Sequence, residues 1–549
     1  MIDSNLEPSR NSEPYDLRGN GVVYTPLPVT QVVVAQAMAK VDASRPKAVL
    51  EPSCGDGSFI RTLSDHSVFD LYALDKDDAA ISKCKSEFRD VSLFCGDFFE
   101  DFPDCWPTSF DLIVGNPPYV SWHRCDARTR ALLDKICDDF GYEHRFLKNA
   151  WAGFVVKAAM KLSENGVLAF VIPYEFLTVS YGKHLRDWME RQFSSIDIYI
   201  PNEKAFKSID QDAVTIIAAK GKDTCKTTLH RVSSLATDII QSSCQVSSGG
   251  AKSSPLGMKG FLIDADALDL IHKLEQRCQP VSDFCESAAG TVTAANDFFI
   301  LSRDDVAFYK LKRWARPIIK KSSFLGDTVD FSMENFEDIN GSGKACYLLD
   351  FGKLKADKLP KAVERYLAIG EEQGIHQRYK CRHRTDWFKV PVVTENDGFF
   401  FKRSHVVPRL CVNSYGALAT DSAYHIRMKP DETVHDLCAS FYNSLTLLFA
   451  EIEGRFYGGG VLELTPNEFR RLPLPRSKFS LSEFSKFQGK FSLSDHGKSA
   501  IQQSNSRLRS LLQMTADEVA IVENARQILQ LHRLRHGDKG SLAPRPLAQ

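Results

Sequence analysis

The stretch VLEPSCGDGSF, residues 49–59, decides the fold class of this chain. Its apolar start predicts a buried strand, its two glycines predict a tight turn, and the residues after them favour a helix. A turn of this kind lets backbone amides approach a ligand, while the helix N-terminus favours a negatively charged group. Plain turns and dinucleotide-binding turns share these features, but the spacing is not G-x-G-x-x-G, which argues against NAD.

Short apolar runs around this stretch predict a doubly wound α/β sheet. Such runs occur at residues 48–50, 71–74, 91–94, 111–114 and 167–172. The spacing between them leaves room for crossover helices. Two further runs, Ile196–Ile200 and Ala213–Ala219, are separated by a loop too short for a crossover helix, so we expect an antiparallel pair at the sheet edge. The prediction is a mostly parallel, seven-stranded sheet whose last strand is antiparallel.

The length of the chain predicts more than one domain, because 549 residues are too many for one ordinary core. Residues 1–20 are polar and predict a flexible N-terminus, and the sheet with its helices accounts for residues 21–225. Mixed short helices and β-rich pieces predict a second domain of α+β character over residues 226–480. The capping box Thr515–Glu518 and the apolar spacing after it predict a C-terminal helical extension over residues 481–549, ending in a loose tail.

Composition excludes several classes of protein. Hydrophobic residues make up 43% and charged residues 25%, which is typical of a globular chain rather than a disordered or coiled-coil one. Because 69 Lys and Arg oppose 70 Asp and Glu, the formal net charge of -1 says nothing about a polyanionic partner. No apolar run reaches the roughly 18 residues that a membrane helix needs, and the polar start is no signal peptide. We therefore predict a cytoplasmic protein with no membrane partner.

The 14 cysteines are scattered between Cys54 and Cys438. They form no C-x-x-C pair and no His/Cys cluster at zinc-ligand spacing. In a chain without a secretion signal, buried free thiols are the expectation. The sequence therefore predicts neither disulfides nor a metal site.

Three acidic residues stand at the ends of successive predicted strands. Glu51 ends the first strand, Asp75 ends the second, and Asp97 follows the third in the run CGDF. Each carboxylate alone could be a solvated loop residue. Because ligands of open α/β sheets bind at the carboxyl ends of the strands, the three together predict a binding site. Asp75 could take both hydroxyls of a ribose, and Asp97 could accept from an adenine amine while Phe98 covers the ring.

The fourth predicted strand ends in Asn116-Pro117-Pro118-Tyr119, and these residue types predict chemistry at a deactivated amine. An exocyclic amine conjugated to a purine ring is a poor nucleophile because its lone pair is delocalised. The Asn116 side-chain oxygen and the Pro117 carbonyl could accept from both N–H groups, favouring a tetrahedral nitrogen that attacks a methyl sulfonium. Proline has no N–H and a fixed φ, so the turn presents carbonyls. Tyr119 would stack on the base; a rigid surface turn is the alternative.

Together, Leu50–Phe59 and Asn116–Tyr119 resemble the S-adenosylmethionine-dependent amino-methyltransferases, specifically the gamma class of DNA adenine-N6 methyltransferases of type II restriction-modification systems. That class places the cofactor motif first, then the catalytic tetrapeptide, then a C-terminal target-recognition domain, which is the order in this chain. The resemblance covers most of residues 21–475. It implies a catalytic domain over 21–225, a DNA target-recognition domain over 226–480, and methyl transfer to N6 of a flipped-out adenine in duplex DNA.

The resemblance also implies which residues bind the cofactor. They are Thr25, Glu51, Cys54, Gly55, Gly57, Asp75, Asp97, Phe98 and Phe154. The first five would surround the methionine end of S-adenosylmethionine, Asp75 its ribose and Asp97 with Phe98 its adenine, while Phe154 would border the pocket. Phe206 is the best match to the aromatic residue that this class stacks on the extruded adenine, although ordinary edge packing is the alternative for it. No metal is implied.

A basic segment of the second domain predicts a nucleic-acid surface. Between His376 and Cys411, eight Lys and Arg outnumber three acidic residues, with aromatic residues interleaved. The residues expected to contact DNA are Arg378, Lys380, Arg382, Arg384, Lys402 and Arg403. A basic surface without a partner is the alternative. We expect a monomer on double-stranded DNA and a separately encoded restriction endonuclease that acts on the same site.

An N-methyltransferase that acts on RNA bases or on a protein glutamine is the alternative function, because those nitrogens are equally deactivated. Such enzymes usually lack a recognition domain of this length, and no RNA-binding module pattern is present. The intact tetrapeptide disfavours a DNA-binding component with an inactive core. The short stretch before Thr25 and the lack of a carboxylate and lysine set near the C-terminus disfavour a fused nuclease. The sequence favours a lone methyltransferase in a bacterial or archaeal cytoplasm.

Overall fold

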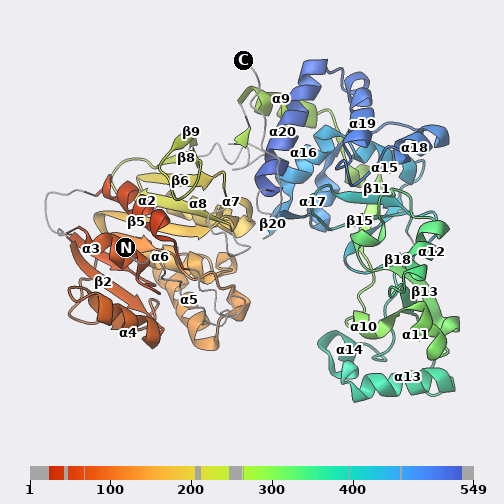
Figure 1. Ribbon diagram of the computed structural model, residues 1–549, viewed down its shortest axis with the longest axis horizontal. Coiled ribbons are helices and arrows are strands. Elements are labelled where there is room, and N and C mark those ends of the chain that lie inside the picture. Colours follow the sequence, from red (N-terminus) through yellow and green to blue (C-terminus); the bar gives the residue numbers. More distant parts are fainter. Residues whose placement is uncertain are drawn as a thin grey trace, which may run out of the picture. The chain divides into compact units, whose positions relative to one another are not determined.

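The computed structural model contains two compact units, divided between Phe261 and Leu262 (Figure 1). We call them the N-terminal unit and the C-terminal unit. The residues that the structure describes are 24–41, 47–66, 69–203, 212–246, 262–263, 265–394, 396–457 and 460–534. The predicted flexible N-terminus over residues 1–20, Phe206 and the predicted loose tail lie outside the described residues.

One sheet organises the N-terminal unit, with the described strands in the order β3-β2-β1-β4-β5-β7-β6-β8-β9. They are β1 (Lys47–Glu51), β2 (Phe69–Asp75), β3 (Ser92–Cys95), β4 (Phe110–Gly115), β5 (Leu162–Pro173), β6 (Ser195–Pro201), β7 (Ala213–Ala219), β8 (Lys226–Val232) and β9 (Ile240–Val246). Neighbours among β1 to β5 pair in parallel, whereas β7 runs antiparallel to β5 and β6. The strand order reverses between β1 and β4, so the predicted doubly wound, mostly parallel α/β sheet is confirmed.

The sheet is larger than predicted. Strands β8 and β9 extend it beyond β6, so the described sheet has nine strands instead of seven, and the β6–β7 pair lies inside the sheet instead of at its edge. The sequence of β9, IQSSCQV, is largely polar and mostly exposed, and it therefore lacks the pattern of a buried strand. Because both strands belong to this sheet, the first compact unit extends to Phe261, beyond the expected domain end at residue 225.

The N-terminal unit also contains helices and short 3₁₀ turns. They are α2 (Leu27–Met38), α3 (Ser58–Ser64), α4 (Asp78–Glu87), η1 (Trp122–Arg124), α5 (Ala127–Phe140), η2 (His144–Phe146), α6 (Ala150–Lys161), α7 (Glu175–Thr178) and α8 (Ser180–Met189). Val33 of α2 and Phe59 of α3 share one core cluster with Val49, Leu112 and Ala169 of the strands. Burial of these strands explains why their sequences are almost continuously apolar.

The C-terminal unit is α+β, as predicted, and contains several small sheets. Its described strands are β10 (Gln279–Pro280), β11 (Cys285–Ala289), β12 (Ile300–Leu301), β13 (Ala315–Ile319), β14 (Tyr347–Leu349), β15 (Gly398–Phe401), β16 (Arg403–Ser404), β17 (Arg409–Val412), β18 (Leu418–Ala419), β19 (Ala423–Met428), β20 (Arg455–Tyr457), β21 (Val461–Glu463) and β22 (Pro473–Leu474). They pair in the orders β11-β19-β15-β17, β12-β14-β13-β18, β16-β21-β20 and β10-β22.

Short helices surround these sheets. They are α9 (Ala265–Glu275), η5 (Val281–Asp283), α10 (Asn296–Phe299), α11 (Arg303–Phe308), η6 (Lys312–Trp314), η7 (Ser322–Phe324), α12 (Met333–Gly341), α13 (Lys361–Glu372), η8 (Ile375–Gln377), α14 (Tyr379–Arg382), α15 (Val434–Phe441), α16 (Ser444–Glu453), α17 (Pro466–Arg471), α18 (Leu481–Gln488), α19 (Lys498–Leu511) and α20 (Ala516–Leu534). Two apolar clusters form in this unit, one around Phe299 and Phe351 and the other around Phe331 and Phe401.

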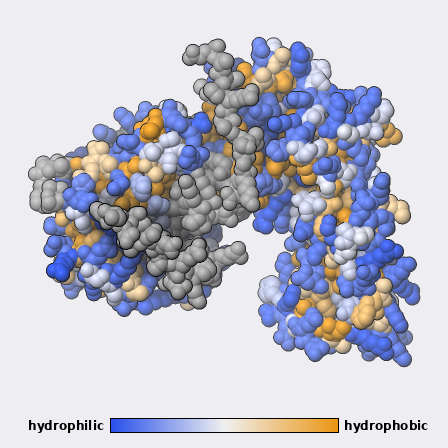
Figure 2. Space-filling view, in the orientation of Figure 1, coloured by the Kyte–Doolittle hydropathy of each residue, from blue (hydrophilic) through white to orange (hydrophobic). Residues whose placement is uncertain are grey.

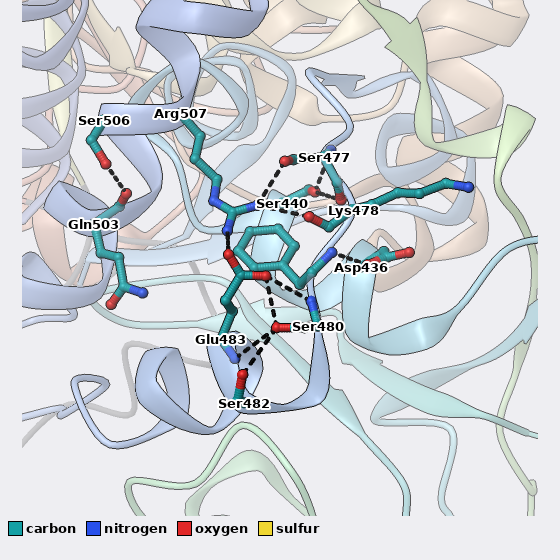
Figure 3. Close-up of polar contacts among 11 residues, drawn as sticks. Asp436, Ser440, Ser477, Lys478, Ser480, Ser482, Glu483, Gln503, Ser506 and Arg507 are labelled. Atoms are coloured by element: carbon teal, nitrogen blue, oxygen red, sulfur yellow. Dashed lines mark hydrogen bonds and ion pairs between the residues drawn. The ribbon is translucent and has the colours of Figure 1, made fainter.

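The helices after residue 480 are part of the C-terminal unit and not an appended extension. Arg533 of α20 is fully buried and pairs with Glu451 of α16 at 2.7 Å. Figure 3 shows a second link, in which Arg507 of α19 donates to the Ser477 hydroxyl at 3.0 Å and to Glu483 of α18 at 2.6 Å. The predicted capping box at the start of α20 is confirmed, because the backbone N–H of Thr515 donates to the Glu518 carboxylate at 2.8 Å and the Glu518 N–H returns a bond at 3.1 Å.

The described helices are too short or too polar to cross a membrane. The longest, α20, spans 19 residues and carries several charged side chains. The face drawn in Figure 2 is mostly hydrophilic on both units, and hydrophobic residues form small separate areas.

Candidate functional site

A cavity of about 570 Å³ lies at the carboxyl ends of strands β1 to β4 in the N-terminal unit. Among the residues predicted to bind a cofactor, those that line it are Thr25, Glu51, Cys54, Gly55, Asp75, Asp97, Phe98 and Phe154. Asn116 and Pro118 of the predicted catalytic turn also line it, whereas Gly57, Pro117 and Tyr119 do not. The folded chain thus brings most of the two predicted residue sets to one cavity.

The glycine turn after β1 adopts a conformation that requires glycine at two positions. Gly55 and Gly57 have φ of 50° and 79°, both in the left-handed region. The backbone N–H of Gly55 donates to Asp75 Oδ2 at 2.9 Å, which ties this turn to the end of β2. A Cβ on Gly57 would lie 2.7 Å from the Phe88 ring, so Gly57 shapes the start of α3 without reaching the cavity.

Glu51 is a buried carboxylate at the base of the cavity. Only 2% of it is exposed, and burial, followed by the neighbouring Cys84 and Asp56, raises its pKa well above the usual value. Its Oε2 is buried and accepts no hydrogen bond. A buried acceptor without a donor is costly in a protein, so this atom fits a ligand that brings an N–H or ammonium group. That observation supports a bound cofactor with a cationic end.

The two aspartates of the site are held in fixed orientations. Asp75 accepts from the backbone N–H groups of Gly55 and Asp77, both at 2.9 Å, and Asp97 accepts from the N–H of Phe99 at 2.9 Å. Each carboxylate keeps further lone pairs for a ligand. The Phe98 ring stacks on Phe154 with centroids 4.8 Å apart and is almost fully buried. These contacts preorganise one end of the cavity for an aromatic ring with polar substituents.

The turn after β4 carries the predicted catalytic residues. The hydroxyl of Ser53 donates to the backbone carbonyl of Asn116 at 3.3 Å and so links this turn to the glycine turn. Tyr119 directs its hydroxyl to the backbone carbonyl of Val171 at 3.3 Å. Burial, and then the charges of Asp212 and Glu175, raise the pKa of Tyr119 well above its usual value. Tyr119 therefore stays protonated and serves as a packed donor in this structure.

The predicted basic surface is only partly assembled. Arg378, Lys380 and Arg382 are exposed around α14, and the Arg382 guanidinium lies 5.5 Å from the Tyr379 ring centroid. Arg384 points inward and donates to the backbone carbonyls of Thr293 at 2.8 Å and Val292 at 3.0 Å.

Two further predicted DNA contacts lie on or beside β16. Arg403 is paired with Glu463 of β21, and Lys402 is half-buried between β15 and β16. Among the six residues predicted to contact DNA, Arg378, Lys380 and Arg382 therefore form one exposed group near α14.

Sequence reasoning missed several charged residues of the cavity wall. They are Asp56, Lys76, Asp77, Arg124 and Asp126. Asp77 and Asp126 are the N-caps of α4 and α5, accepting from Ala79 at 3.0 Å and Thr129 at 2.7 Å. Aspartate is among the preferred N-cap residues, so each of these two aspartates could have marked the start of its helix. No cluster of metal-ligating side chains occurs within the described residues.

Two protein families match this chain. The family described as "Eco57I restriction-modification methylase" matches residues 61–206, which include β2 to β6 and the predicted catalytic turn. The family described as "Type II methyltransferase M.Eco57I, C-terminal domain" matches residues 258–508, which cover most of the C-terminal unit. Each match covers less than half of the chain, and together they support a methylase of type II restriction-modification systems.

Individual relatives agree with this assignment. The chain is 23% identical over 493 residues to the type II methyltransferase M.AccI of Acinetobacter calcoaceticus, a match that covers 82% of this chain and 84% of the relative. It is 26% identical over 214 residues to M.HincII of Haemophilus influenzae, covering 37% and 38% of the two chains. A solved structure of the type IIL restriction-modification enzyme MmeI in complex with DNA shares the fold at a TM-score of 0.54 and 11% identity, covering 95% of this chain and 80% of that one. These similarities support a methyltransferase of restriction-modification systems, and the solved structure supports the fold alone.

Proposed function

We propose that this protein is a gamma-class, site-specific DNA methyltransferase that transfers the methyl group of S-adenosylmethionine to N6 of adenine. The observation that carries the proposal is the convergence of Asn116 and Pro118 with Glu51, Asp75 and Asp97 on one cavity. A purine amine needs acceptors for its N–H groups, and the methyl donor needs acceptors for its ammonium and ribose. Both sets of acceptors meet here.

The cofactor would lie along the ends of the strands. Glu51 Oε2 would accept from the ammonium group near Thr25 and the Cys54–Gly55 backbone, and Asp75 would take the ribose hydroxyls. Asp97 would accept from the adenine amine beside Phe98 and Phe154. When bound, S-adenosylmethionine supplies an electrophilic methyl group on a sulfonium.

The catalytic turn would act on the target amine. The side-chain oxygen of Asn116 and the carbonyl of Pro117 would each accept one N–H group, which concentrates the lone pair on the nitrogen and stabilises the charge that develops during transfer. Because this cavity cannot reach an atom inside a stacked duplex, the adenine must leave the helix, at a cost of a few kcal/mol. Tyr119 and Phe206 are proposed to stack on the extruded base.

Double-stranded DNA is the proposed partner, bound by a single copy of the chain. Arg378, Lys380 and Arg382 are exposed and can neutralise phosphates. Arg384, Lys402 and Arg403 have internal or paired positions, so we assign them a smaller share of the binding. Restriction-modification methylases protect host DNA, and we propose the same role here, beside a separately encoded endonuclease in a bacterial or archaeal cytoplasm.

The nature of the product tests the proposal. Purified protein is incubated with labelled S-adenosylmethionine and genomic DNA from a host that lacks the gene, and the nucleosides are separated by mass spectrometry. N6-methyladenine in one sequence context is expected. N4-methylcytosine would contradict adenine specificity, and label only in RNA or in protein glutamine would replace the proposal with the alternative function.

Asn116→Ala tests the catalytic assignment. Methyl transfer should fall by about 100- to 1,000-fold, the usual cost of removing one such transition-state hydrogen bond. Affinity for S-adenosylhomocysteine and for DNA should stay within about twofold, because binding contacts elsewhere are intact. Single-turnover transfer and equilibrium titration measure the two effects separately. Near-normal turnover in this variant would exclude Asn116 from catalysis.

A further inference from the structure

One carboxylate outside the cavity, Glu175, is placed behind the proposed catalytic turn. It begins α7 directly after the carboxyl end of β5, and β5 pairs in parallel with β4, where Gly115 is opposite Phe170. The turn Asn116–Tyr119 therefore leaves the sheet on the strand next to Glu175. Glu175 does not line the cavity, and neither the sequence pattern nor the comparisons assign it a role.

Glu175 gathers several donors from α6 and α8. Its Oε1 accepts from the indole of Trp151 at 3.1 Å and from the side-chain amide of Asn149 at 3.3 Å. Burial and the charge of Glu175 raise the pKa of the Tyr181 phenol of α8, so Tyr181 also lies near this carboxylate. If Glu175 were removed, the indole N–H of Trp151 would lose this acceptor. Because Trp151 is fully buried, water could not replace the acceptor.

Asn149 connects this network to the catalytic turn. Its backbone forms an isolated antiparallel bridge with Ser121, and the segment on either side continues the pairing. The N–H of Ala150 donates to the Val120 carbonyl at 2.8 Å, and the N–H of Trp122 donates to the Lys148 carbonyl at 3.0 Å. Backbone hydrogen bonds thus hold the residues that follow Tyr119 against the start of α6. The side chain of Glu175, in turn, links the start of α6 to the end of β5.

The arrangement of Asn149 is energetically unfavourable in two respects. Asn149 is the N-cap of α6 but makes no side-chain capping bond, although asparagine is among the best N-cap residues. Its Oδ1 is buried without a hydrogen-bond partner. A lost cap and a buried acceptor without a donor are penalties that persist where an arrangement serves a function.

We propose that Glu175 is a positioning residue, which holds the exit of the Asn116–Tyr119 turn and thereby keeps Asn116 at its working distance from the methyl donor. The inference rests on the proposed function. It predicts that loss of Glu175 slows methyl transfer without weakening cofactor binding, because Glu51 and Asp75 end β1 and β2 and Asp97 follows β3, away from β5. A displaced catalytic group can cost up to about 100-fold in rate.

The experiment compares Glu175→Ala, Glu175→Gln and the control Glu164→Ala in full-length protein. Glu164 is an exposed residue near the start of β5, at the other end of the strand that precedes Glu175. Single-turnover transfer from S-adenosylmethionine to unmodified genomic DNA should slow by about 10- to 100-fold in the alanine variant. The glutamine variant, whose amide oxygen still accepts, should recover most of the rate, and the control should match wild type. Affinity for S-adenosylhomocysteine should be unchanged throughout.

A double variant separates positioning from a general loss of structure. If Glu175 acts through the turn, Glu175→Ala should add little to the rate loss of Asn116→Ala, because residues that act as a unit are not additive. Additive losses, an equal fall in cofactor affinity, or a rate within about threefold of wild type in Glu175→Ala would overturn the inference. Full activity of Asn116→Ala would instead contradict the proposed function, so the two failures are distinguishable.

Discussion

Each unit buries a glutamate, and the two glutamates are used in opposite ways. Glu51 in the N-terminal unit faces a cavity, and its Oε2 accepts no hydrogen bond. Glu451 in the C-terminal unit accepts from Arg533 through both carboxylate oxygens, at 2.7 and 2.8 Å. An open buried carboxylate costs stability and is available to a ligand, whereas a closed pair joins two helices. The open carboxylate therefore marks the site, and the closed pair belongs to the scaffold.

Breaking the closed pair should have the largest effect. In Arg533→Met, Glu451 keeps a buried charge without its bidentate partner, and the free energy of unfolding of the C-terminal unit should fall by about 3–5 kcal/mol. Urea unfolding of the full chain measures this loss. Adding Glu451→Leu to the same variant removes the stranded charge and should recover most of the stability. A single variant as stable as wild type would mean that the pair does not hold α16 and α20 together.

Removing the charge of the open carboxylate, Glu51, should have the opposite effect on stability. Glu51→Gln removes the charge and keeps an acceptor for the backbone N–H of Ile60. At neutral pH the free energy of unfolding of the N-terminal unit should rise by about 1–3 kcal/mol, because a buried charge is no longer desolvated. Affinity for S-adenosylhomocysteine should fall by about tenfold or more, since the amide cannot offer a full charge to the ammonium group.

The pH dependence gives this prediction a second readout. Because the pKa of Glu51 is raised in the folded state, the folded protein binds more protons than the unfolded chain above the ordinary value of 4.5. The contribution of Glu51 to stability is therefore fully present below 4.5 and is lost as the pH rises through the raised pKa. Glu51→Gln should lack this decline. Unchanged cofactor affinity in this variant would show that Glu51 is not the ammonium ligand.

The sequence predicted the N-terminal unit well because its site follows from topology. Strand ends of a doubly wound sheet meet at one edge, so Glu51, Asp75 and Asp97 could be assigned to one cavity from their positions alone. Thr25 and Phe154, which also line it, were assigned only through the family resemblance. The polar strand β9 was missed because an exposed edge strand carries no apolar pattern. Glu175 was missed for a different reason: its partners come from α6 and α8, and no spacing rule relates them.

The basic segment of the C-terminal unit shows where sequence reasoning is weakest. A surplus of arginines predicts a positive charge, but it does not predict in which direction each side chain points. Arg382 and Arg384 lie two positions apart, and their side chains point in opposite directions. Arg382 ends the short helix α14 in solvent, whereas Arg384 follows it and donates to carbonyls of the Val292–Thr293 loop. Burial lowers the pKa of Arg384 from its usual value, in keeping with this internal position. The direction of the Arg384 side chain depends on contacts with residues more than 90 positions away, whereas Arg382 lies over Tyr379, three positions away.

Substitutions of these two arginines should have the smallest effects, and each variant serves as a control for the other. Arg382→Ala should weaken binding to duplex DNA by about two- to tenfold and reduce the salt slope of log K by about 1, because one phosphate contact is lost. Its stability should not change, since the side chain is exposed. Arg384→Ala should instead lower the free energy of unfolding by about 1–2 kcal/mol, because the carbonyls of Val292, Thr293 and Trp387 lose their donor, while DNA affinity of the folded protein stays the same. Fluorescence anisotropy at several salt concentrations and urea unfolding measure both quantities for both variants. If Arg384→Ala reduced the salt slope and Arg382→Ala did not, the exposed group around α14 would not be the DNA-binding surface, and the inward arginine would have to turn outward to reach DNA.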